Sequence, residues 1–379
     1  MSVKGLRKMI YPFAPDQSGA VSVLYELGGM VIICDAGGCA GNVCGFDEPR
    51  WLGTKSAVFS AGLRDMDAIL GRDDLLIDKI SKAAEKLEAK FVAIIGTPVP
   101  ATIATDYRAL KRMAEKRTGL PVITVDSNGA KLYDEGEEKA YLELFRRFAA
   151  DAAGRASDRD LGDPEVDDSE SIDNSGNLII PGSVGVIGAT PLDFEGDDLA
   201  GRIAASLEAK GVSRVICYGI GSSLEDVSDA GFMEKNIVVS PAGIRPAEYL
   251  KERFGTPYEI YDPLAEEALQ KVVQGKAADM DAAFGGRKVL IIHQQVRANT
   301  IRDIIEKETD AEVTAASWFM MSDTIRRPGD IHIREEEDFF DLAENGGYDV
   351  IIADGSFRKP ARGFAGTFIE MPHFAVSGV

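Results

Sequence analysis

The chain has 379 residues, 45% of them hydrophobic and 27% charged, and carries a formal net charge of −20 at pH 7. This composition is typical of a globular protein with two or three domains, and the acidic balance disfavours nucleic acid as a partner. Because no run of about 18 apolar residues occurs, and because the N-terminal segment lacks the apolar core of a secretory signal, we expect a cytoplasmic protein with no membrane partner.

The first predicted strand, residues 27–33, leads into a glycine-rich loop that holds three of the four cysteines, Cys34, Cys39 and Cys44. Closely spaced cysteines in a cytoplasmic protein bind metal more often than they form disulfides. Thiolates on a loop that can wrap tightly suit an iron–sulfur cluster, and we expect the 4Fe-4S type. The alternative is that Cys34 is a buried strand residue and Cys44 an incidental thiol.

Three thiolates leave a 4Fe-4S cluster one ligand short. Asp35 is the nearest oxygen donor along the chain, and Asp47 is another. A second copy of the chain could also supply the fourth ligand across a two-fold axis. The fourth cysteine, Cys217, lies inside a predicted strand, which favours a buried structural thiol over a ligand.

Apolar runs rich in Val and Ile recur along the chain and alternate with helical stretches. Such continuous runs predict strands that are covered on both faces, and their alternation with helices predicts parallel sheets. In sheets of this kind, ligands bind beyond the carboxyl ends of the strands. The runs are residues 91–95, 121–125, 184–187, 214–217, 288–292 and 349–353.

Two composition breaks divide the chain. Residues 151–178 are rich in Asp, Ser and Gly and predict an acidic linker or surface loop, and a second break falls near Gly275. The prediction is therefore three Rossmann-like α/β modules. They are an N-terminal module with the cysteine loop (1–150), a second module (179–275) and a third module (276–379).

Polar and cationic residues after the later strands are candidates for binding a small-molecule substrate. The loop 219–226, which contains Ser222, lacks the glycine pattern and the lysine of a nucleotide site, so we expect it to face a substrate cavity, as does the loop 188–193. Cations that could hold substrate carboxylates, or could equally be solvated, are Arg245, Arg358, Lys359 and Arg362.

The chain has three histidines, too few and too scattered for a histidine-based metal site. His293 ends a predicted strand, and His373 lies in the C-terminal part of the chain, after the last predicted strand. Both are candidate catalytic proton donors, because imidazole titrates near neutral pH. The alternative is that each is an ordinary packing or surface residue.

Several segments, taken together, resemble the nitrogenase component 1 family. That family includes the subunits of the nitrogenase MoFe protein, the dark-operative protochlorophyllide reductase and the nickel-tetrapyrrole cyclase. The likeness extends in order over most of the chain. It is carried by FAPDQSGA (13–20), ICDAGGC (33–39), SAGLRDMDAILG (60–71), TPVPATIATD (97–106), GLPVITVD (119–126), GIGSSLE (219–225), KNIVV (235–239) and FGTPY (254–258).

The resemblance implies an oxidoreductase, the substrate-reducing half of a two-component system. A separate ATP-dependent iron–sulfur reductase would dock and pass electrons to the bound cluster, and an unidentified small molecule would be reduced in the cleft between modules. The resemblance also implies a dimer, with either an identical or a related subunit.

The departures from the family pattern concern its cysteines. Cys39 matches the cluster cysteine of the Gly-Gly-Cys loop, but the family's other two cluster cysteines fall near Phe13 and near Thr97 or Pro98, where no cysteine is present. The family's cofactor-binding cysteine falls at Ser240 or Pro241. An ordinary eight-iron cluster and an iron–molybdenum cofactor are therefore not expected.

Two other functions fit the same residues. The chain could be a non-catalytic scaffold or carrier for the assembly of a metal cofactor. It could also be a small-molecule-binding protein that kept the fold and uses its thiols for zinc or not at all.

Overall fold

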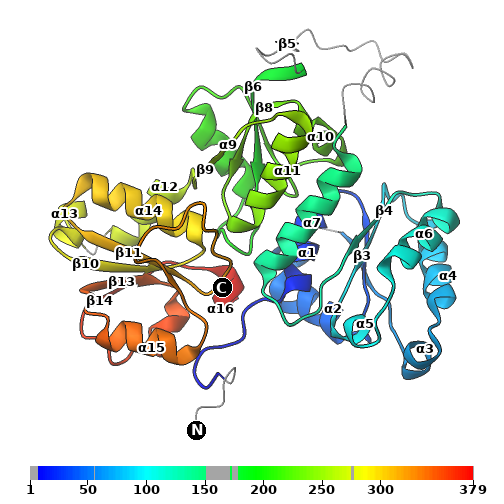
Figure 1. Cartoon of the computed structure of the whole chain (residues 1–379), viewed down its shortest axis with the longest axis horizontal. Coiled ribbons are helices and arrows are strands. Elements are labelled where there is room, and N and C mark those ends of the chain that lie inside the picture. Colours follow the sequence, from blue (N-terminus) through cyan, green and yellow to red (C-terminus); the bar gives the residue numbers. More distant parts are fainter. Residues whose placement is uncertain (1–6, 55, 151–170, 173–177, 275–276, 379) are drawn as a thin grey trace.

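The computed structural model describes residues 7–54, 56–150, 171–172, 178–274 and 277–378. These residues form three sheets of predominantly parallel strands, each flanked by helices, which lie around a common centre (Figure 1). The predicted α/β class with three Rossmann-like modules is confirmed. Most of the predicted linker 151–178 and the break at Gly275 lie outside the described residues, so the predicted module boundaries stay predictions.

The first sheet is entirely parallel and has the strand order β2-β1-β3-β4. Side chains alternate across it. Val31 and Ile33 pack on the side of α1 and α7, whereas Met30 and Ile32 pack on the side of α4 and α6. Its elements are α1 (Asp16–Leu24), β1 (Met30–Ile33), α2 (Gly38–Asn42), the π-helix η1 (Val43–Asp47), η2 (Pro49–Leu52), β2 (Ala57–Ser60), α3 (Asp65–Leu70), α4 (Asp73–Ala84), β3 (Val92–Ile95), α5 (Pro98–Thr102), α6 (Tyr107–Thr118), β4 (Val122–Val125) and α7 (Tyr133–Phe148).

The second sheet is parallel except at one edge. β6 pairs in parallel with β7 and β8, β8 pairs with β9, and the short β5 joins β6 antiparallel. Its elements are β5 (Ser171–Ile172), β6 (Leu178–Ile187), α9 (Leu199–Glu208), β7 (Arg214–Cys217), α10 (Leu224–Ser228), η3 (Asp229–Gly231), β8 (Met233–Val238), η4 (Pro241–Gly243), α11 (Ile244–Phe254) and β9 (Tyr258–Ile260).

The third sheet is entirely parallel and has the strand order β12-β11-β10-β13-β14. The sequence did not predict three of its strands, β11, β12 and β14, nor β2, β5 and β9 of the other sheets. Its elements are α12 (Ala265–Val273), α13 (Met280–Phe284), β10 (Lys288–Ile292), α14 (Gln295–Glu308), β11 (Glu312–Ser317), β12 (Ile331–His332), α15 (Glu336–Asn345), β13 (Val350–Ala353), η5 (Gly355–Phe357), β14 (Thr367–Glu370) and α16 (Phe374–Ser377).

α1 and α7 approach each other too closely for side chains at two positions. A Cβ atom on Gly19 would lie 1.9 Å from the carbonyl oxygen of Tyr133, and one on Gly136 would lie 1.7 Å from that of Asp16. Glycine is required at both positions because no side chain fits. This contact fixes the first turn of α7, which points toward the centre of the molecule (Figure 1).

Both ends of the described chain tie the modules together. The Glu336 carboxylate at the start of α15 accepts backbone N–H bonds from Lys8, Met9 and Ile10 at 2.6–2.8 Å. In α16, the Ala375 carbonyl accepts from the Ala14 N–H, and the Ala375 N–H donates to the Leu192 carbonyl, both at 2.9 Å. The segment around Ala375 is therefore bonded to residues of the first and second modules.

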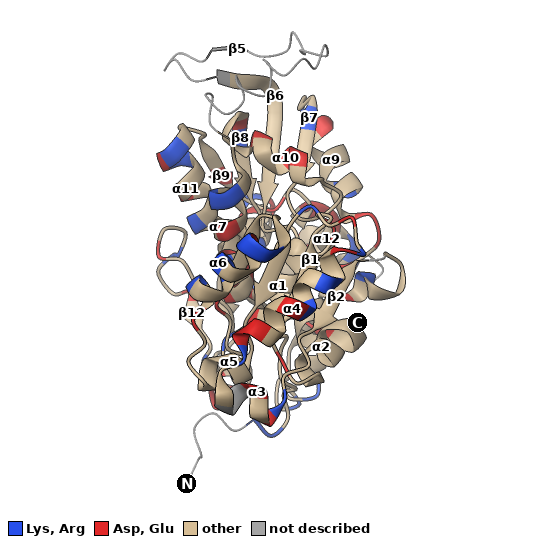
Figure 2. Ribbon diagram, turned by 90° about the vertical axis from the view of Figure 1, so that its right-hand side faces the viewer, with Lys and Arg blue, Asp and Glu red and all other residues tan. Residues whose placement is uncertain are grey.

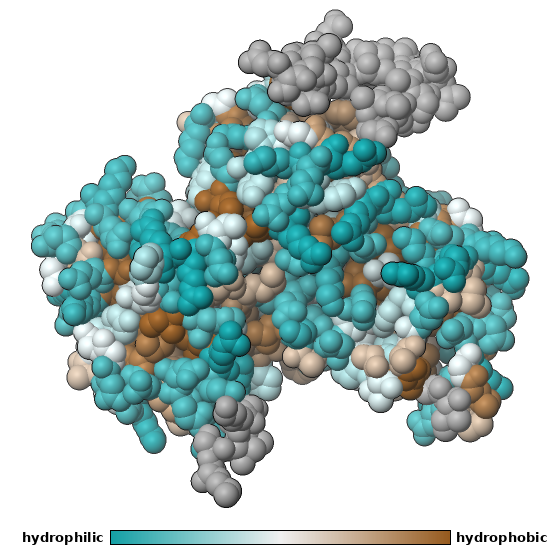
Figure 3. Space-filling model, in the orientation of Figure 1, coloured by the Kyte–Doolittle hydropathy of each residue, from teal (hydrophilic) through white to brown (hydrophobic). Residues whose placement is uncertain are grey.

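Charged residues are distributed over the outer helices (Figure 2), and the face shown in Figure 3 is mostly hydrophilic. Exposed large apolar side chains include some on and near the cysteine loop and on α3. Phe46 is 74% exposed, Leu52 97%, Met66 55% and Leu70 56%. The part of the chain that the structure describes contains no helix with both the length and the apolarity needed to cross a bilayer.

Candidate functional site

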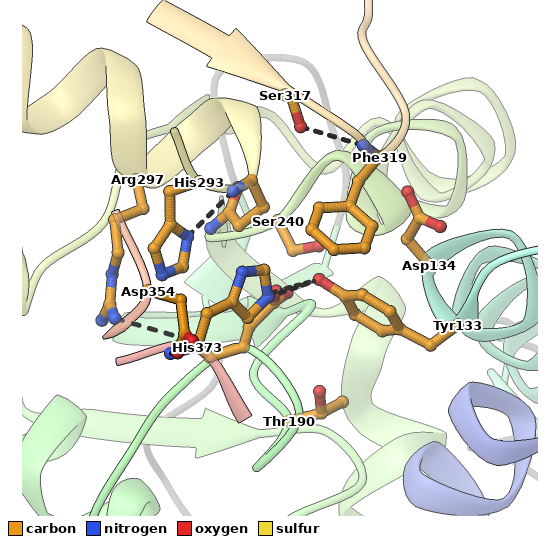
Figure 4. A network of polar contacts seen from close by, with 12 residues as sticks. Tyr133, Asp134, Thr190, Ser240, His293, Arg297, Ser317, Phe319, Asp354 and His373 are labelled. Atoms are coloured by element: carbon orange, nitrogen blue, oxygen red, sulfur yellow. Dashed lines mark hydrogen bonds and ion pairs between the residues drawn. The ribbon is translucent and has the colours of Figure 1, made fainter. Parts of the chain in front are cut away.

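A buried cluster of polar side chains lies where the three sheets meet (Figure 4). Tyr133 begins α7, Asp193 follows β6, His293 follows β10, Asp354 follows β13 and His373 follows β14. Each is at most 2% exposed. The carboxyl ends of strands from different modules thus supply one site, as expected for parallel sheets.

The two histidines that the sequence singled out are brought together. Their rings stack with centroids 4.1 Å apart and an angle of 6° between their planes. His373 Nε2 lies 3.1 Å from Asp193 Oδ1 and 3.0 Å from the Tyr133 hydroxyl, and that hydroxyl donates a short hydrogen bond to the same Asp193 oxygen. The Asp354 carboxylate fixes the backbone of His373 by accepting its N–H at 2.9 Å.

The two histidines differ in their electrostatic surroundings. Burial lowers the pKa of His293 well below its usual value, and the nearby His373 and Arg297 lower it further. His293 Nδ1 accepts the backbone N–H of Gln294 at 2.8 Å, which places the proton of the neutral ring on Nε2. Of the two rings, it is His373 that contacts the Asp193 carboxylate.

Phe319 closes one side of this group. Its ring lies 4.9 Å from that of His373 and 5.0 Å from that of Tyr133, both edge to face. Burial raises the pKa of Tyr133 well above its usual value, and Asp193 raises it further, so the hydroxyl keeps its proton. The arrangement can hold a proton on His373 and release it to a reacting group, in a place from which water is excluded.

Sequence reasoning missed the partners of His373. Asp193 lies at the end of the predicted loop 188–193, so its place after a strand was visible, but Tyr133 lies at a helix start that carried no signal. Arg297 was also missed. It donates from Nε to Asp262 Oδ2 at 2.7 Å, and its guanidinium lies 4.4 Å from the centre of the Phe194 ring.

The structure does not bring the three cysteines of the loop together. Cys34 continues the alternation of β1, so its side chain packs in the core with Leu76, Ile94 and Leu110 on the side of α4 and α6. Burial, with smaller contributions from Asp35 and Asp73, raises its pKa to about 12. A thiol in this position has neither the charge nor the access of a cluster ligand.

Cys39 and Cys44 are half-buried and lie on α2 and the π-helix, respectively. Burial raises the pKa of both thiols; Asp35 adds to this for Cys39, and Glu48 and then Asp35 for Cys44. A bound metal would therefore be needed to hold them as thiolates at neutral pH. Space is available, because a Cβ atom on any of the glycines of the loop would meet nothing within 4 Å; these are Gly37, Gly38, Gly41 and Gly45.

Asp35, the predicted oxygen ligand, is already engaged. Its Oδ2 accepts the backbone N–H of Ala40 at 2.7 Å and its Oδ1 accepts the Ser60 hydroxyl at 2.5 Å. Within the described ranges, no three His, Cys, Asp or Glu side chains converge as a metal site. The described residues therefore offer two half-buried thiols, Cys39 and Cys44, and no complete ligand set.

The predicted substrate-binding cations do not reach the histidines. Arg358 is exposed and pairs with Glu370 at 2.7 Å, Arg245 is exposed and pairs with Glu138 at 3.3 Å, and Lys359 and Arg362 are exposed. Ser222 lines a groove of about 410 Å³ between the first and second modules, where its hydroxyl accepts the N–H of Gly219.

We expect the four cysteines to react at different rates with iodoacetamide in the native, iron-free protein. Cys39 and Cys44 should be alkylated near pH 8.5 within minutes to hours, whereas the buried Cys34 and Cys217 should stay unmodified because access and thiolate formation are both denied. Peptide mass spectrometry after labelling measures this. Labelling in denaturant, where all four should react, is the control, and rapid native labelling of Cys34 would contradict its placement.

Comparison with known proteins places these features in a family context. The model of the family described as nitrogenase component 1 type oxidoreductases matches residues 17–266. A solved structure described as "Nitrogenase Cp1 at pH 6.5" has a TM-score of 0.67 and 12% identity, covering 98% of this chain and 88% of that one. Another, "Nitrogenase Cp1 at pH 5", has a TM-score of 0.67 and 16% identity, covering 97% and 84%. No curated protein matches.

Proposed function

This chain belongs to the nitrogenase component 1 type oxidoreductases, and from that premise we propose that it is a catalytic component that reduces a small molecule. Electrons would come from a separate ATP-dependent reductase of the iron-protein kind. The observation that carries the proposal is the stacked pair of His293 and His373, buried at the meeting point of the three sheets and joined to Asp193. Reduction of most organic groups consumes protons as well as electrons, and His373 is placed to deliver them.

Cys39 and Cys44 are the proposed ligands of a metal–sulfur cluster, which when bound would supply one-electron chemistry. Since the described residues of one chain supply only part of a ligand set, a second subunit, identical or related, would complete it. The exposed Phe46 and Leu52 beside these thiols support a protein partner at this surface. The proposed place of action is the cytoplasm, where reduced thiols persist.

Within the chain, the residues at the centre have separate roles. Asp193 orients His373 and stabilises its imidazolium, and Tyr133 holds the shared Asp193 oxygen in place. His293 stays neutral beside it and covers one face of the ring. Phe319 excludes water, so that a proton released from His373 passes to the bound reactant and not to solvent.

A test of the proposal is anaerobic purification followed by iron and sulfide analysis and electron paramagnetic resonance. A catalytic component should contain iron and acid-labile sulfide and give a cluster signal on reduction. It should also oxidise its cognate reductase in an ATP-dependent way. A colourless, iron-free protein would overturn the proposal and favour a small-molecule-binding protein.

A scaffold or carrier for cofactor assembly is the second candidate, and the incomplete set of thiols favours it. A site with few ligands can release what it holds more readily than a closed one. The two candidates differ in one measurement: a scaffold transfers its iron–sulfur unit to an acceptor protein without turnover, whereas a catalytic component retains it over many turnovers.

A further inference from the structure

Three carboxyl groups lie close together beside the histidine pair. Asp134 and Glu137 are one turn apart on α7, and Asp193 lies in the loop after β6. Their exposed fractions are 2%, 0% and 0%, respectively. All three belong to the same electrostatic neighbourhood, because Asp193 acts on both of the α7 carboxyls.

The cations near these carboxyls are already occupied. Arg50, the guanidinium whose charge acts on Glu137, binds Glu48 at 2.7 and 2.8 Å and Glu26 at 2.9 Å. Arg297 binds Asp262. Among the described residues that contact the three carboxyls, His373 is left as the group that can carry an uncompensated positive charge.

Three buried carboxylates beside one imidazolium cannot all be ionised, because an unpaired buried charge costs several kcal/mol. At least one of the three therefore holds a proton at neutral pH. Hydrogen bonding indicates which one, because a carboxylate is favoured where N–H and O–H groups donate to it.

Asp134 accepts two backbone N–H groups, from Met320 and Glu135. Asp193 accepts from Tyr133 and faces His373.

Glu137 has the poorest surroundings for a negative charge. One of its oxygens accepts the Thr190 hydroxyl at 2.6 Å, and the other, Oε2, has no hydrogen-bond partner among the described residues. Asp193 Oδ2 likewise lacks one there. The two residues are held near each other, because the Asp193 N–H donates to the Thr190 carbonyl within one turn. Tyr141 of α7 and Gly19 of α1 also lie near Glu137, and neither offers a positive charge.

We propose that Glu137 is a neutral, proton-holding carboxyl group that recharges His373 through Asp193. The role of Glu137 in recharging His373 rests on the proposed function, whereas the neutral state of Glu137 does not. In the step, a proton leaves Glu137 Oε2, Asp193 passes a proton to the imidazole, and the products are a Glu137 carboxylate and a His373 imidazolium. One proton moves and no electron does.

A groove offers the route by which Glu137 regains its proton. About 370 Å³ in volume, it is lined by Glu26, Arg50 and Pro191. Pro191 follows Thr190 directly in the chain, so the floor of the groove lies one residue from the hydroxyl that binds Glu137.

Infrared spectroscopy of the full-length protein tests the protonation state without substrate, reductase or cluster. A protonated carboxyl shows a C=O stretching band separate from that of carboxylates. The spectrum should be measured near pH 8.5. Burial raises the pKa of Asp134 to about 7, so Asp134 is mostly ionised at this pH and the band is then assigned to Glu137. We expect the wild-type band to be absent in Glu137→Gln and present in Glu135→Gln, a matched change at a half-exposed neighbour that pairs with Lys131.

A second variant keeps the test decisive if Glu137→Gln does not fold. Thr190→Val removes the hydroxyl that donates to Glu137, so the same band should shift to higher frequency. Absence of a carboxylic acid band from the wild type, its persistence in Glu137→Gln, or an unshifted band in Thr190→Val would overturn the assignment.

The link to His373 has its own readout. Because glutamine resembles a neutral glutamic acid, Glu137→Gln should leave the titration of His373, followed by nuclear magnetic resonance, within about 0.3 pH units of wild type. If Glu137 were ionised in the wild type, its replacement would remove a negative charge and lower the pKa of His373 by about one unit or more. That result would overturn the proposal even if the iron content and the turnover of the protein were normal.

Discussion

Replacing Cys39 with alanine should reduce the iron content of the anaerobically purified protein to background. Cys39 is half-buried on a loop with open space beside it, and the sequence resemblance matches it to a cluster cysteine of the family. Removing one of two accessible thiols from an already incomplete ligand set should abolish retention of a cluster and not merely weaken it. Iron and sulfide per chain, together with the reduced-state resonance spectrum, measure the effect.

Two further cysteine variants serve as controls. Cys217→Ala should retain wild-type iron, because this thiol lies in the core of the second module. Cys34→Ala should also retain wild-type iron, because Cys34 packs in the core among Leu76, Ile94 and Leu110. The three-thiol site predicted from the sequence would instead require this variant to lose iron. Equal iron in Cys39→Ala and wild type would show that the iron is bound elsewhere.

Replacing Arg297 with methionine should lower the free energy of unfolding by about 3–5 kcal/mol, because it leaves a buried carboxylate without its partner. The side chains of Arg297 and Asp262 are 3% and 0% exposed, and their N–O distance is 2.7 Å. The variant also loses the contact between the guanidinium and the Phe194 ring. The shift of the urea midpoint at constant slope measures the change.

A matched control is Arg245→Met, which breaks a pair whose arginine is 62% exposed. That change should cost about 0–1 kcal/mol. Adding Asp262→Asn to Arg297→Met should recover part of the loss, because asparagine removes the unpaired charge and can still accept the Leu264 N–H at the start of α12. If Arg297→Met were as stable as Arg245→Met, the buried ion pair would not stabilise the fold.

The sequence predicted the fold because the signals for buried parallel strands are local. Continuous Val and Ile runs, as in 288–292 and 349–353, became β10 and β13. Short edge strands such as β9 and β12 carry no such run, since their pairing depends on neighbours that tertiary structure supplies. Many short segments, each only loosely similar, carried the family resemblance because they occur in the same order. The family model matches residues 17–266.

The site was predicted in part. His293 follows a strand that the sequence predicted, so a general rule of parallel sheets placed it at a ligand-binding edge. His373 follows β14, a strand that the sequence did not predict. Their stacking depends on how the strand ends of the third sheet face those of the others, which no local pattern encodes. For Cys34 the sequence was insufficient. Alternation along β1 determines on which face of the sheet its side chain lies, but that face is buried only because α4 and α6 cover it.

The bonds of Ala375 to Ala14 and Leu192 also have a consequence for the order of assembly in the cell. A ribosome produces residues 373–376 after every strand of the three described sheets, so His373 joins its partners only when the preceding modules are already made. Each module can form its own sheet during synthesis, but the proton-holding centre matures last. Chains released early would carry three sheets and no working centre.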